Sequence, residues 1–344
     1  MKVSDLSSKK TEEFSLPVLT AGIENQGLNN YAPKNNATIL KNVISISANG
    51  ANTGATFYQN KEFTVLQDAY AISFKGDYTP NDDEYLFLAS AIKKVIYGSF
   101  TWTDKAGWEK VKKEFIRLPV KNDKIDFEFM GAYISELEEE RISELNAYLT
   151  VSKLDDYKLS NKEKETLKNF KYIKWKEFNL EKLFGKATRG KRLKAEDRLS
   201  GDLPFVTAGE RNTGISAFIR NDVKIFPENT VTIDMFGSAK YRNYKYGADD
   251  HIAVVNTSNL KKESSLFVTA AIHKSSYNGQ FNYGRNFYAK DADNLSIMLP
   301  VKNDEIDFYT INALISAVKK LVIKDVVLYA DNKIKATKKA VKKH

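Results

Sequence analysis

Leu118-Pro-Val-Lys-Asn-Asp-Lys-Ile-Asp-Phe127 returns later in the chain as Leu299-Pro-Val-Lys-Asn-Asp-Glu-Ile-Asp-Phe308, with nine of ten residues identical at an offset of 181. A second segment, Leu16-Pro-Val-Leu-Thr-Ala-Gly22, returns as Leu203-Pro-Phe-Val-Thr-Ala-Gly209, with five of seven identical at an offset of 187. Matches in the same order at nearly the same offset indicate a tandem duplication. A period of about 185 residues is too long for a solenoid repeat, so each copy should fold as a domain.

The two copies share one predicted order of elements. Runs of β-branched residues at 43–46 and 230–233 predict strands, because Asn, Gly and Pro bound them. After each repeated Leu-Pro segment the apolar residues take a helical spacing instead. They include Ile134, Leu137 and Leu145 in the first copy, and Ile311, Leu314, Ile315, Val318, Leu321 and Val322 in the second. The predicted fold class is mixed α/β, with two tandem globular domains, each followed by a long helix.

The two long helices carry different charges between their apolar positions. Glutamates predominate at 125–149, and lysines predominate in the second helix. This difference favours pairing of the helices as an antiparallel coiled coil, and the alternative is two ordinary core helices. The predicted boundaries are a first domain at 1–124, a helix and connection at 125–170, a second domain at 171–305, and a helix with a basic tail at 306–344.

The first copy has no counterpart of the apolar segment that leads into the second copy. That segment contains Trp175, Phe178, Leu180, Leu183 and Phe184. Its apolar side chains should each contribute about 1.5 to 3 kcal/mol when buried. We therefore expect the first domain to be the less stable half, with exposed apolar surface where this segment would lie.

Composition excludes several classes of function. The 344 residues are 42% apolar and 28% charged, with a mean hydropathy of −0.45, which is typical of a soluble globular protein. No apolar run is long enough for a membrane span or a signal peptide, so a cytoplasmic location is expected. Cysteine is absent, which excludes disulfides, thiol nucleophiles and Cys-ligated zinc. Histidine occurs three times.

No motif in the sequence predicts a catalytic or metal site. Gly185-Lys-Ala-Thr-Arg-Gly190-Lys191 has the glycine and lysine spacing of a phosphate-binding loop, but Arg192 stands where Ser or Thr should bind magnesium. The adjacent Asp249, Asp250 and His251 are interpreted as structural residues at a strand start. The chain is therefore not expected to be an enzyme, and neither catalytic nor metal-binding residues are assigned.

Basic and aromatic residues interleave in segments that are predicted to be loops, and the net charge of +9 suits a polyanionic partner. Arg and Lys can donate to guanine or to phosphates, and Asn and Gln can bind adenine. The alternative is a solvated edge hairpin whose aromatic side chains face the core. The predicted DNA contacts are Lys61, Lys93, Lys94, Trp102 and Lys105 in the first copy, and Arg189, Lys191, Arg192, Lys240, Tyr241, Arg242, Asn243, Tyr244, Lys245, Lys274, Tyr277, Asn278, Gln280 and Arg285 in the second.

The duplicated framework with divergent loops resembles the specificity subunits of type I restriction-modification systems, including related subunits of systems that cut on both sides of their site. The resemblance covers nearly the whole chain. It departs from the family where Leu-Pro-Val-Lys-Asn-Asp replaces the usual Leu-Pro-Pro. The matching segments are Trp175 to Lys191, Leu203-Pro-Phe-Val-Thr-Ala-Gly209, Ile233 with Gly237, Asp250-His-Ile252, and Leu299-Pro.

The resemblance implies two target-recognition domains, each reading half of a bipartite site in double-stranded DNA. The helices would fix the spacing of the halves and dock methyltransferase subunits, two of which are expected. Restriction subunits and a second copy of the chain are further candidate partners. S-adenosylmethionine, magnesium and ATP would belong to partner subunits, with no cofactor in this chain. The alternative function is a non-enzymatic adhesion or scaffold protein that binds protein or carbohydrate through its aromatic loops.

Overall fold

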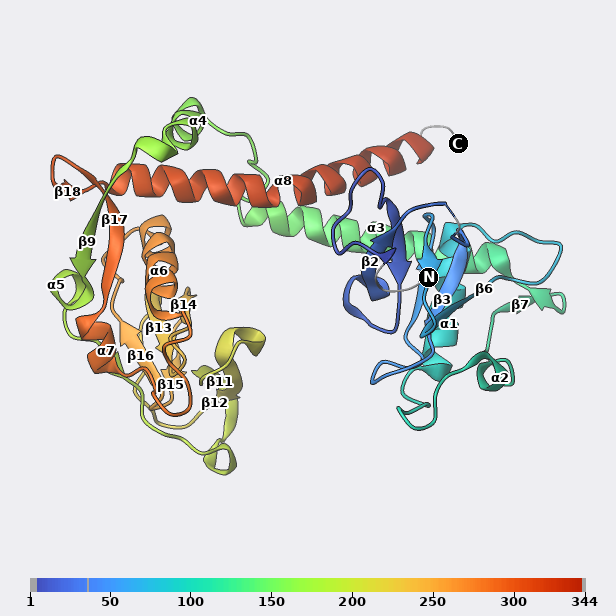
Figure 1. Ribbon diagram of the computed structural model, residues 1–344, viewed down its shortest axis with the longest axis horizontal. Coiled ribbons are helices and arrows are strands. Elements are labelled where there is room, and N and C mark those ends of the chain that lie inside the picture. Colours follow the sequence, from blue (N-terminus) through green and yellow to red (C-terminus); the bar gives the residue numbers. More distant parts are fainter. Residues whose placement is uncertain (1–4, 36, 342–344) are drawn as a thin grey trace. The chain divides into compact units, whose positions relative to one another are not determined.

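A computed structural model describes residues 5–35 and 37–341, with side chains described as far as residue 337. The chain divides into two compact units (Figure 1). Unit 1 contains Met1–Leu145 together with Lys333–His344, and unit 2 contains Asn146–Asn332. Each unit therefore includes one globular copy of the repeat and parts of both long helices. No helix in the described part of the chain is long and apolar enough to cross a membrane.

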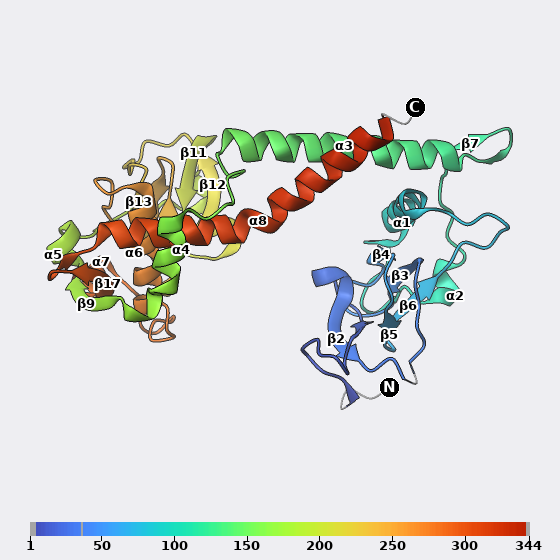
Figure 2. The same cartoon turned by 90° about the horizontal axis from the view of Figure 1, so that it is seen from above.

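Unit 1 is built from two small three-stranded sheets, a helix and a hairpin. The sheets have the orders β2-β1-β5 and β4-β3-β6, and α1 packs against β4 and β3 (Figure 2). The hairpin of β7 and β8 leads into α3. The elements are β1 (Leu16–Leu19), η2 (Glu24–Gly27), β2 (Leu28–Ala32), β3 (Val43–Ser47), β4 (Thr56–Gln59), β5 (Thr64–Val65), β6 (Ala69–Ile72), α1 (Asp82–Ile96), α2 (Trp108–Val111), β7 (Val120–Lys121), β8 (Lys124–Ile125) and α3 (Phe127–Val151).

Unit 2 repeats this order and adds a leading strand, helix and short strand. Its sheets have the orders β12-β11-β15, β10-β16-β13-β14 and β18-β17-β9, with α6 against β14, β13 and β17. The elements are α4 (Asn161–Lys168), η3 (Phe170–Tyr172), β9 (Lys174–Asn179), α5 (Leu180–Phe184), β10 (Thr188–Arg189), η4 (Ala195–Asp197), β11 (Ser200–Val206), η5 (Arg211–Gly214), β12 (Ile215–Ile219), β13 (Thr230–Asp234), β14 (Ala239–Arg242), β15 (Gly247–Ala248), β16 (Ile252–Val255), α6 (Lys262–Ser276), α7 (Ala289–Asn294), β17 (Ser296–Lys302), β18 (Glu305–Ile306) and α8 (Phe308–Val341).

The repeated sequence produces the same backbone geometry in both units. Each Lys-Asn-Asp segment forms a two-residue hairpin, with φ of 52° and 59° at Asn122 and Asp123 and of 52° and 64° at Asn303 and Asp304. Asn and Asp tolerate this left-handed conformation, which the twist of a tight hairpin requires. The tandem duplication and the mixed α/β fold class predicted from the sequence are confirmed.

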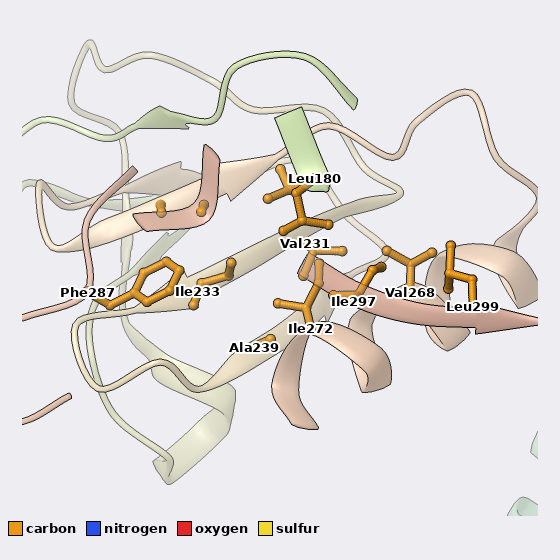
Figure 3. Packing of buried hydrophobic residues seen from close by; sticks show 12 residues of the cluster. Leu180, Val231, Ile233, Ala239, Val268, Ile272, Phe287, Ile297 and Leu299 are labelled. Atoms are coloured by element: carbon orange, nitrogen blue, oxygen red, sulfur yellow. The ribbon is translucent and has the colours of Figure 1, made fainter. Parts of the chain in front are cut away.

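The core of unit 2 lies between its main sheet, α6 and β17. Val231 and Ile233 from β13 meet Ile272 from α6 and Ile297 from β17 (Figure 3). Leu180 from the leading segment belongs to the same buried cluster. The smaller core of unit 1 places residues of β3, α1 and α3 together, among them Ile44, Ile46, Leu88, Ile96 and Met130.

The two units differ most at the strand that precedes each long helix. In unit 2, β9 pairs antiparallel with β17 from Ser296 to Val301, and β17 is seven residues long. In unit 1 the equivalent strand β7 has two residues, and among the described residues no strand pairs with positions 116–119. Phe115, which directly precedes these unpaired positions, is 91% exposed. The leading segment thus extends the strand in one copy only.

The long helices begin near the predicted positions, but their apolar residues are not all buried. In α8, Ile311 and Leu314 are buried, whereas Val318, Leu321 and Val322 are exposed; in α3, Leu137 is exposed and Ile134 and Leu145 are half-buried. Within unit 1, Lys333 Nζ of α8 lies 2.6 Å from Glu138 Oε1 of α3. Pairing along the whole length of both helices stays a prediction.

Candidate nucleic-acid interface

A tight loop after α6 presents Tyr283 to solvent. Asn282 and Arg285 exchange two backbone hydrogen bonds of 3.0 and 3.1 Å, which leaves Tyr283 and Gly284 at the tip. Asn282 Oδ1 also accepts a 2.9 Å hydrogen bond from the backbone of Gly284. The Tyr283 ring lies edge-on to Phe236 with centroids 5.1 Å apart, yet the residue is 86% exposed. The tip is therefore fixed by the backbone while its aromatic ring remains available.

The equivalent loop of unit 1 presents Trp102 in the same way. The backbone N–H of Thr101 donates to the carbonyl of Asp104 at 2.9 Å, as Asn282 does to Arg285 at the offset of 181. Trp102 is 70% exposed. Trp102 was predicted as a contact residue and Tyr283 was not, although the offset aligns them. The residues flanking the two rings differ in charge and in hydrogen-bonding groups.

Several predicted contact residues surround Tyr283. Lys274, Tyr277, Asn278 and Gln280 are exposed on the end of α6 and the loop that follows it. Ser276 Oγ ties this end of α6 to the β13–β14 turn by donating to the carbonyl of Gly237 at 2.6 Å. These side chains gather at one end of unit 2.

Arg285, in the same loop, is exposed but already forms an ion pair with Asp291. The hydrogen bond to Asp291 raises the pKa of Arg285 above its ordinary value. Arg285 therefore remains cationic, and part of its donor capacity is directed to α7.

Lys240 was predicted to contact DNA, but it is mostly enclosed. Its Nζ lies 3.0 Å from Glu210 Oε1 and 3.4 Å from the buried Asp234, and it donates to Ser238 Oγ at 2.8 Å. Asp234 in turn accepts hydrogen bonds from the backbone of Phe236 and Ser238. Lys240 therefore joins the β13–β14 turn to the loop that contains Glu210.

Arg242 differs most from the expectation, because it is only 1% exposed. Its Nε donates to Thr232 Oγ1 and its Nη1 to the Tyr244 hydroxyl, both at 2.9 Å. Tyr244 is half-buried beside it, and Tyr241 is half-buried and donates to Asn229 Oδ1 at 3.0 Å. Arg242 is therefore an interior residue at the end of β14, which corrects the expectation that it lies in an exposed loop.

Asn243 and Lys245 are exposed, but they lie at the opposite end of β14 from Tyr283. Here the backbone of Asn229 donates to the carbonyl of Arg242 at 2.7 Å, and Phe226 donates to Tyr246 at 2.8 Å. The structure therefore divides the basic and aromatic run at 240–246 between enclosed positions and one exposed surface, that of Asn243 and Lys245.

Arg189, Lys191 and Arg192 form an exposed basic loop. The backbone N–H of Lys191 donates to the carbonyl of Ala248 at 3.1 Å, and a Cβ on Gly190 would lie 1.8 Å from that oxygen. Glycine is therefore required for this close approach of the two backbone segments. The loop carries three cations on a backbone that is held in place.

Asp249, Asp250 and His251 lie beside this basic loop, with potential ligand atoms within 4.8 Å of one another. Asp249 Oδ1 accepts a 3.3 Å hydrogen bond from the backbone of Leu193. At least one carboxylate of the cluster therefore accepts a hydrogen bond from the backbone, as expected for a residue with a structural role.

In unit 1, the predicted lysines Lys61, Lys93, Lys94 and Lys105 are all exposed. Lys93 Nζ lies 5.6 Å from the centre of the Phe57 ring and 5.7 Å from that of Tyr97. Lys94 lines an open apolar groove on α1. The lysines of α1 thus face aromatic surfaces of unit 1.

Comparison with known proteins identifies the family of this framework. The family model of the type I restriction modification DNA specificity domain matches residues 2–147 and 172–327. The chain belongs to this family. The two matched segments coincide with the two copies of the repeat, and they contain Trp102 and Tyr283, respectively.

Two known specificity subunits resemble this chain over most of its length. It is 22% identical over 308 residues to the specificity subunit S.BcgI of a type II restriction enzyme from Heyndrickxia coagulans, covering 88% of this chain and 85% of that protein. The crystal structure of the type I restriction-modification S subunit from M. genitalium has a TM-score of 0.59 and 14% identity, covering 98% of this chain and 88% of that one. The second likeness shows that the fold is shared.

Proposed function

We propose that the chain is a DNA-recognition subunit of a restriction-modification system, in which each unit reads one half of a bipartite site in double-stranded DNA. The observation that carries this proposal is the equivalent placement of Trp102 and Tyr283 on two repeated loop tips. Both rings are exposed, and both tips are closed by a backbone hydrogen bond. A repeated frame with different tip residues is what two domains that read different sequences require.

The side chains around each tip have the chemistry of groove recognition. Asn278 and Gln280 can donate and accept hydrogen bonds at adenine edges, and the aromatic rings can contact thymine methyl groups. The basic loop of Arg189, Lys191 and Arg192 would bind phosphates and position the unit without reading sequence. In unit 1, Lys105 beside Trp102 supplies the cation.

The exposed apolar residues of the long helices support a role in docking partners. Val318, Leu321 and Val322 of α8 are exposed, although helices of folded proteins usually bury such residues. We infer that methyltransferase subunits, two in number, cover the helices, and that the helices set the spacing of the half-sites. Methyl transfer and cleavage, with S-adenosylmethionine, magnesium and ATP, would then belong to partner chains in the cytoplasm.

Salt dependence and selection of DNA test the proposed function together. The chain is combined with its methyltransferase partner, and bound duplexes are selected from a random pool. A bipartite sequence and an affinity that falls steeply with salt are expected, because bound phosphates release counterions. The purified chain alone should transfer no methyl group to DNA. A salt-independent affinity for protein or carbohydrate would instead favour an adhesion or scaffold role.

A further inference from the structure

An open apolar groove on unit 1 includes one predicted DNA contact, Lys94, and no residue of the loop that presents Trp102. It encloses about 800 Å³ between α1, α3 and the segment before β7. Phe87, Phe115, Phe129 and Tyr133 line it, and Phe115, Phe129 and Tyr133 are exposed. Arg117 also lines the groove and is exposed. This is a large apolar surface to leave in contact with water.

The chain itself covers part of the equivalent surface of unit 2, and an open groove of about 680 Å³ remains beside Trp175 and Met298. Phe267 corresponds to Phe87 at an offset of 180. The Trp175 ring of β9 stacks on Phe267 with centroids 6.2 Å apart and an interplanar angle of 18°, and Phe170 packs edge-on against Trp175. The strand that carries Trp175 also pairs with β17 along six positions. Unit 2 therefore shows which kind of segment fits this surface of the repeat.

The pairing register of unit 2 also specifies a charge. Met298 of β17 lies opposite Glu177 of β9, and Arg117 takes the position of Met298 in unit 1. A carboxylate on a strand in the same register would lie directly across from Arg117. Opposite charges at facing positions of an antiparallel pair stabilise the pairing.

We propose that unit 1 binds an extended segment of a partner polypeptide, which adds antiparallel to residues 116–120. An aromatic side chain of the segment covers Phe87, as Trp175 covers Phe267, and an acidic side chain faces Arg117. Backbone hydrogen bonds along the strand supply affinity, and the alternating side chains supply specificity. This interaction goes beyond the proposed function, because it adds a polypeptide-binding site beside the start of α3 and requires no DNA.

The occupant is a different polypeptide rather than a second copy of this chain. Each copy uses its own β9 to pair with β17, and Leu180, which follows β9 directly, is buried in the core of unit 2. A second copy could offer β9 only by opening that core. A partner with a free aromatic and acidic segment has no such cost.

The test uses the full chain and a labelled synthetic peptide with the sequence of residues 170–184. Fluorescence anisotropy should show saturable binding, and hydrogen exchange should slow at residues 116–120 without change at β17. Arg117→Glu should weaken binding by about two- to thirtyfold, because like charges would replace the favourable pair, and a peptide in which Glu177 is replaced by Lys should restore it. Arg220→Glu, which changes an exposed arginine of unit 2, is the matched control and should bind the original peptide as the natural chain does.

Three results would overturn the proposal. The first is the absence of saturable peptide binding, and the second is equal affinity of the Arg117→Glu variant and the natural chain for the original peptide. The third is slowed exchange at 116–120 that rises with protein concentration in the absence of peptide, because it would assign the groove to a second copy. Restoration of binding by the charge exchange separates a specific contact from a folding defect.

Discussion

Ser316 of α8 donates a 2.6 Å hydrogen bond from its hydroxyl to Glu163 Oε1 in the first turn of α4. Glu163 Oε2 accepts from the backbone of Ser160 at 2.7 Å and lies 3.3 Å from Lys320 Nζ. Burial alone would raise the pKa of Glu163, but hydrogen bonds from Ser316, Ser160 and Lys320 outweigh it and hold the pKa at about 2. This carboxylate fixes the connection between the copies onto α8 within unit 2.

The first prediction concerns Glu163→Gln, which keeps the shape of the side chain and removes its charge. A lowered carboxyl pKa stabilises the folded state fully above the ordinary value of 4.5, and this contribution is lost as pH falls through about 2. Urea unfolding at pH 7 should show a loss of about 1 to 3 kcal/mol, as for hydrogen bonds to a charged group. The difference from the natural chain should shrink below pH 4.5. Glu165→Gln, at an exposed position of α4, is the control, and a loss independent of pH would contradict the assignment.

The second prediction separates interior cations from exposed ones. Arg242→Met should lower the free energy of unfolding of unit 2 by about 2 to 4 kcal/mol, because Thr232 and Tyr244 lose their buried partner. Lys245→Met, three residues away on the surface, should change it by less than about 0.5 kcal/mol. Denaturant unfolding followed by a probe in unit 2 measures both. Equal stability of the two variants would show that Arg242 is not held in the interior.

The third prediction concerns the two loop tips. Tyr283→Ser should change the bases selected in one half-site, and Trp102→Ser should change those in the other, each at a cost of about 1 to 3 kcal/mol for the affected base. Tyr172→Ser, at an exposed tyrosine outside the loop, is the matched control. Selection from random duplexes in the presence of the methyltransferase partner measures the outcome. A uniform loss of affinity for all sequences would make the rings general stacking surfaces.

The framework could be predicted from the sequence because the repeat itself marks it. The Lys-Asn-Asp hairpins recur with the same residues, and each residue has a local conformational preference that tertiary contacts need not supply. The repeated segments that begin at Leu118 and Leu299 therefore allow the two domains to be aligned, although the loops between the repeated segments differ. Family membership follows from the same framework, since the matched motifs are mainly structural.

The binding surface was less predictable, because exposure depends on pairing between distant strands. Arg242 lies opposite Thr230 of β13 and donates to Thr232 Oγ1 on the same strand, and no local pattern marks these partners. Tyr283 was missed because its exposure depends on the hairpin closed by Asn282 and Arg285. Only its alignment with Trp102 could have indicated its position. Interleaved basic and aromatic residues thus predict a binding function better than they predict the contact residues.

The fourth prediction follows from the proposal that the helices set the spacing of the half-sites. One heptad inserted after Leu145 and another after Val326, the equivalent position of α8, would lengthen each helix by about 10 Å. The spacer between the half-sites should widen by about 3 base pairs, and the bases read in each half should not change. Selection from random duplexes shows both properties. An unchanged spacer would exclude the helices as the ruler.

The last prediction compares the stability of the two copies. The six-position pairing of β9 with β17 and the buried Leu180 strengthen unit 2 alone. Burial of one leucine contributes about 1.5 to 3 kcal/mol, and the paired strand adds backbone hydrogen bonds. Native-state hydrogen exchange of the full chain should therefore give β3 a lower opening free energy than β13. Residues 116–118 should exchange faster than 297–299, because among the described residues only 297–299 pair with another strand. Leu180→Ala should lower protection of β13 and leave β3 unchanged, whereas equal protection of the two strands in the natural chain would show that the leading segment contributes little to the stability of its domain.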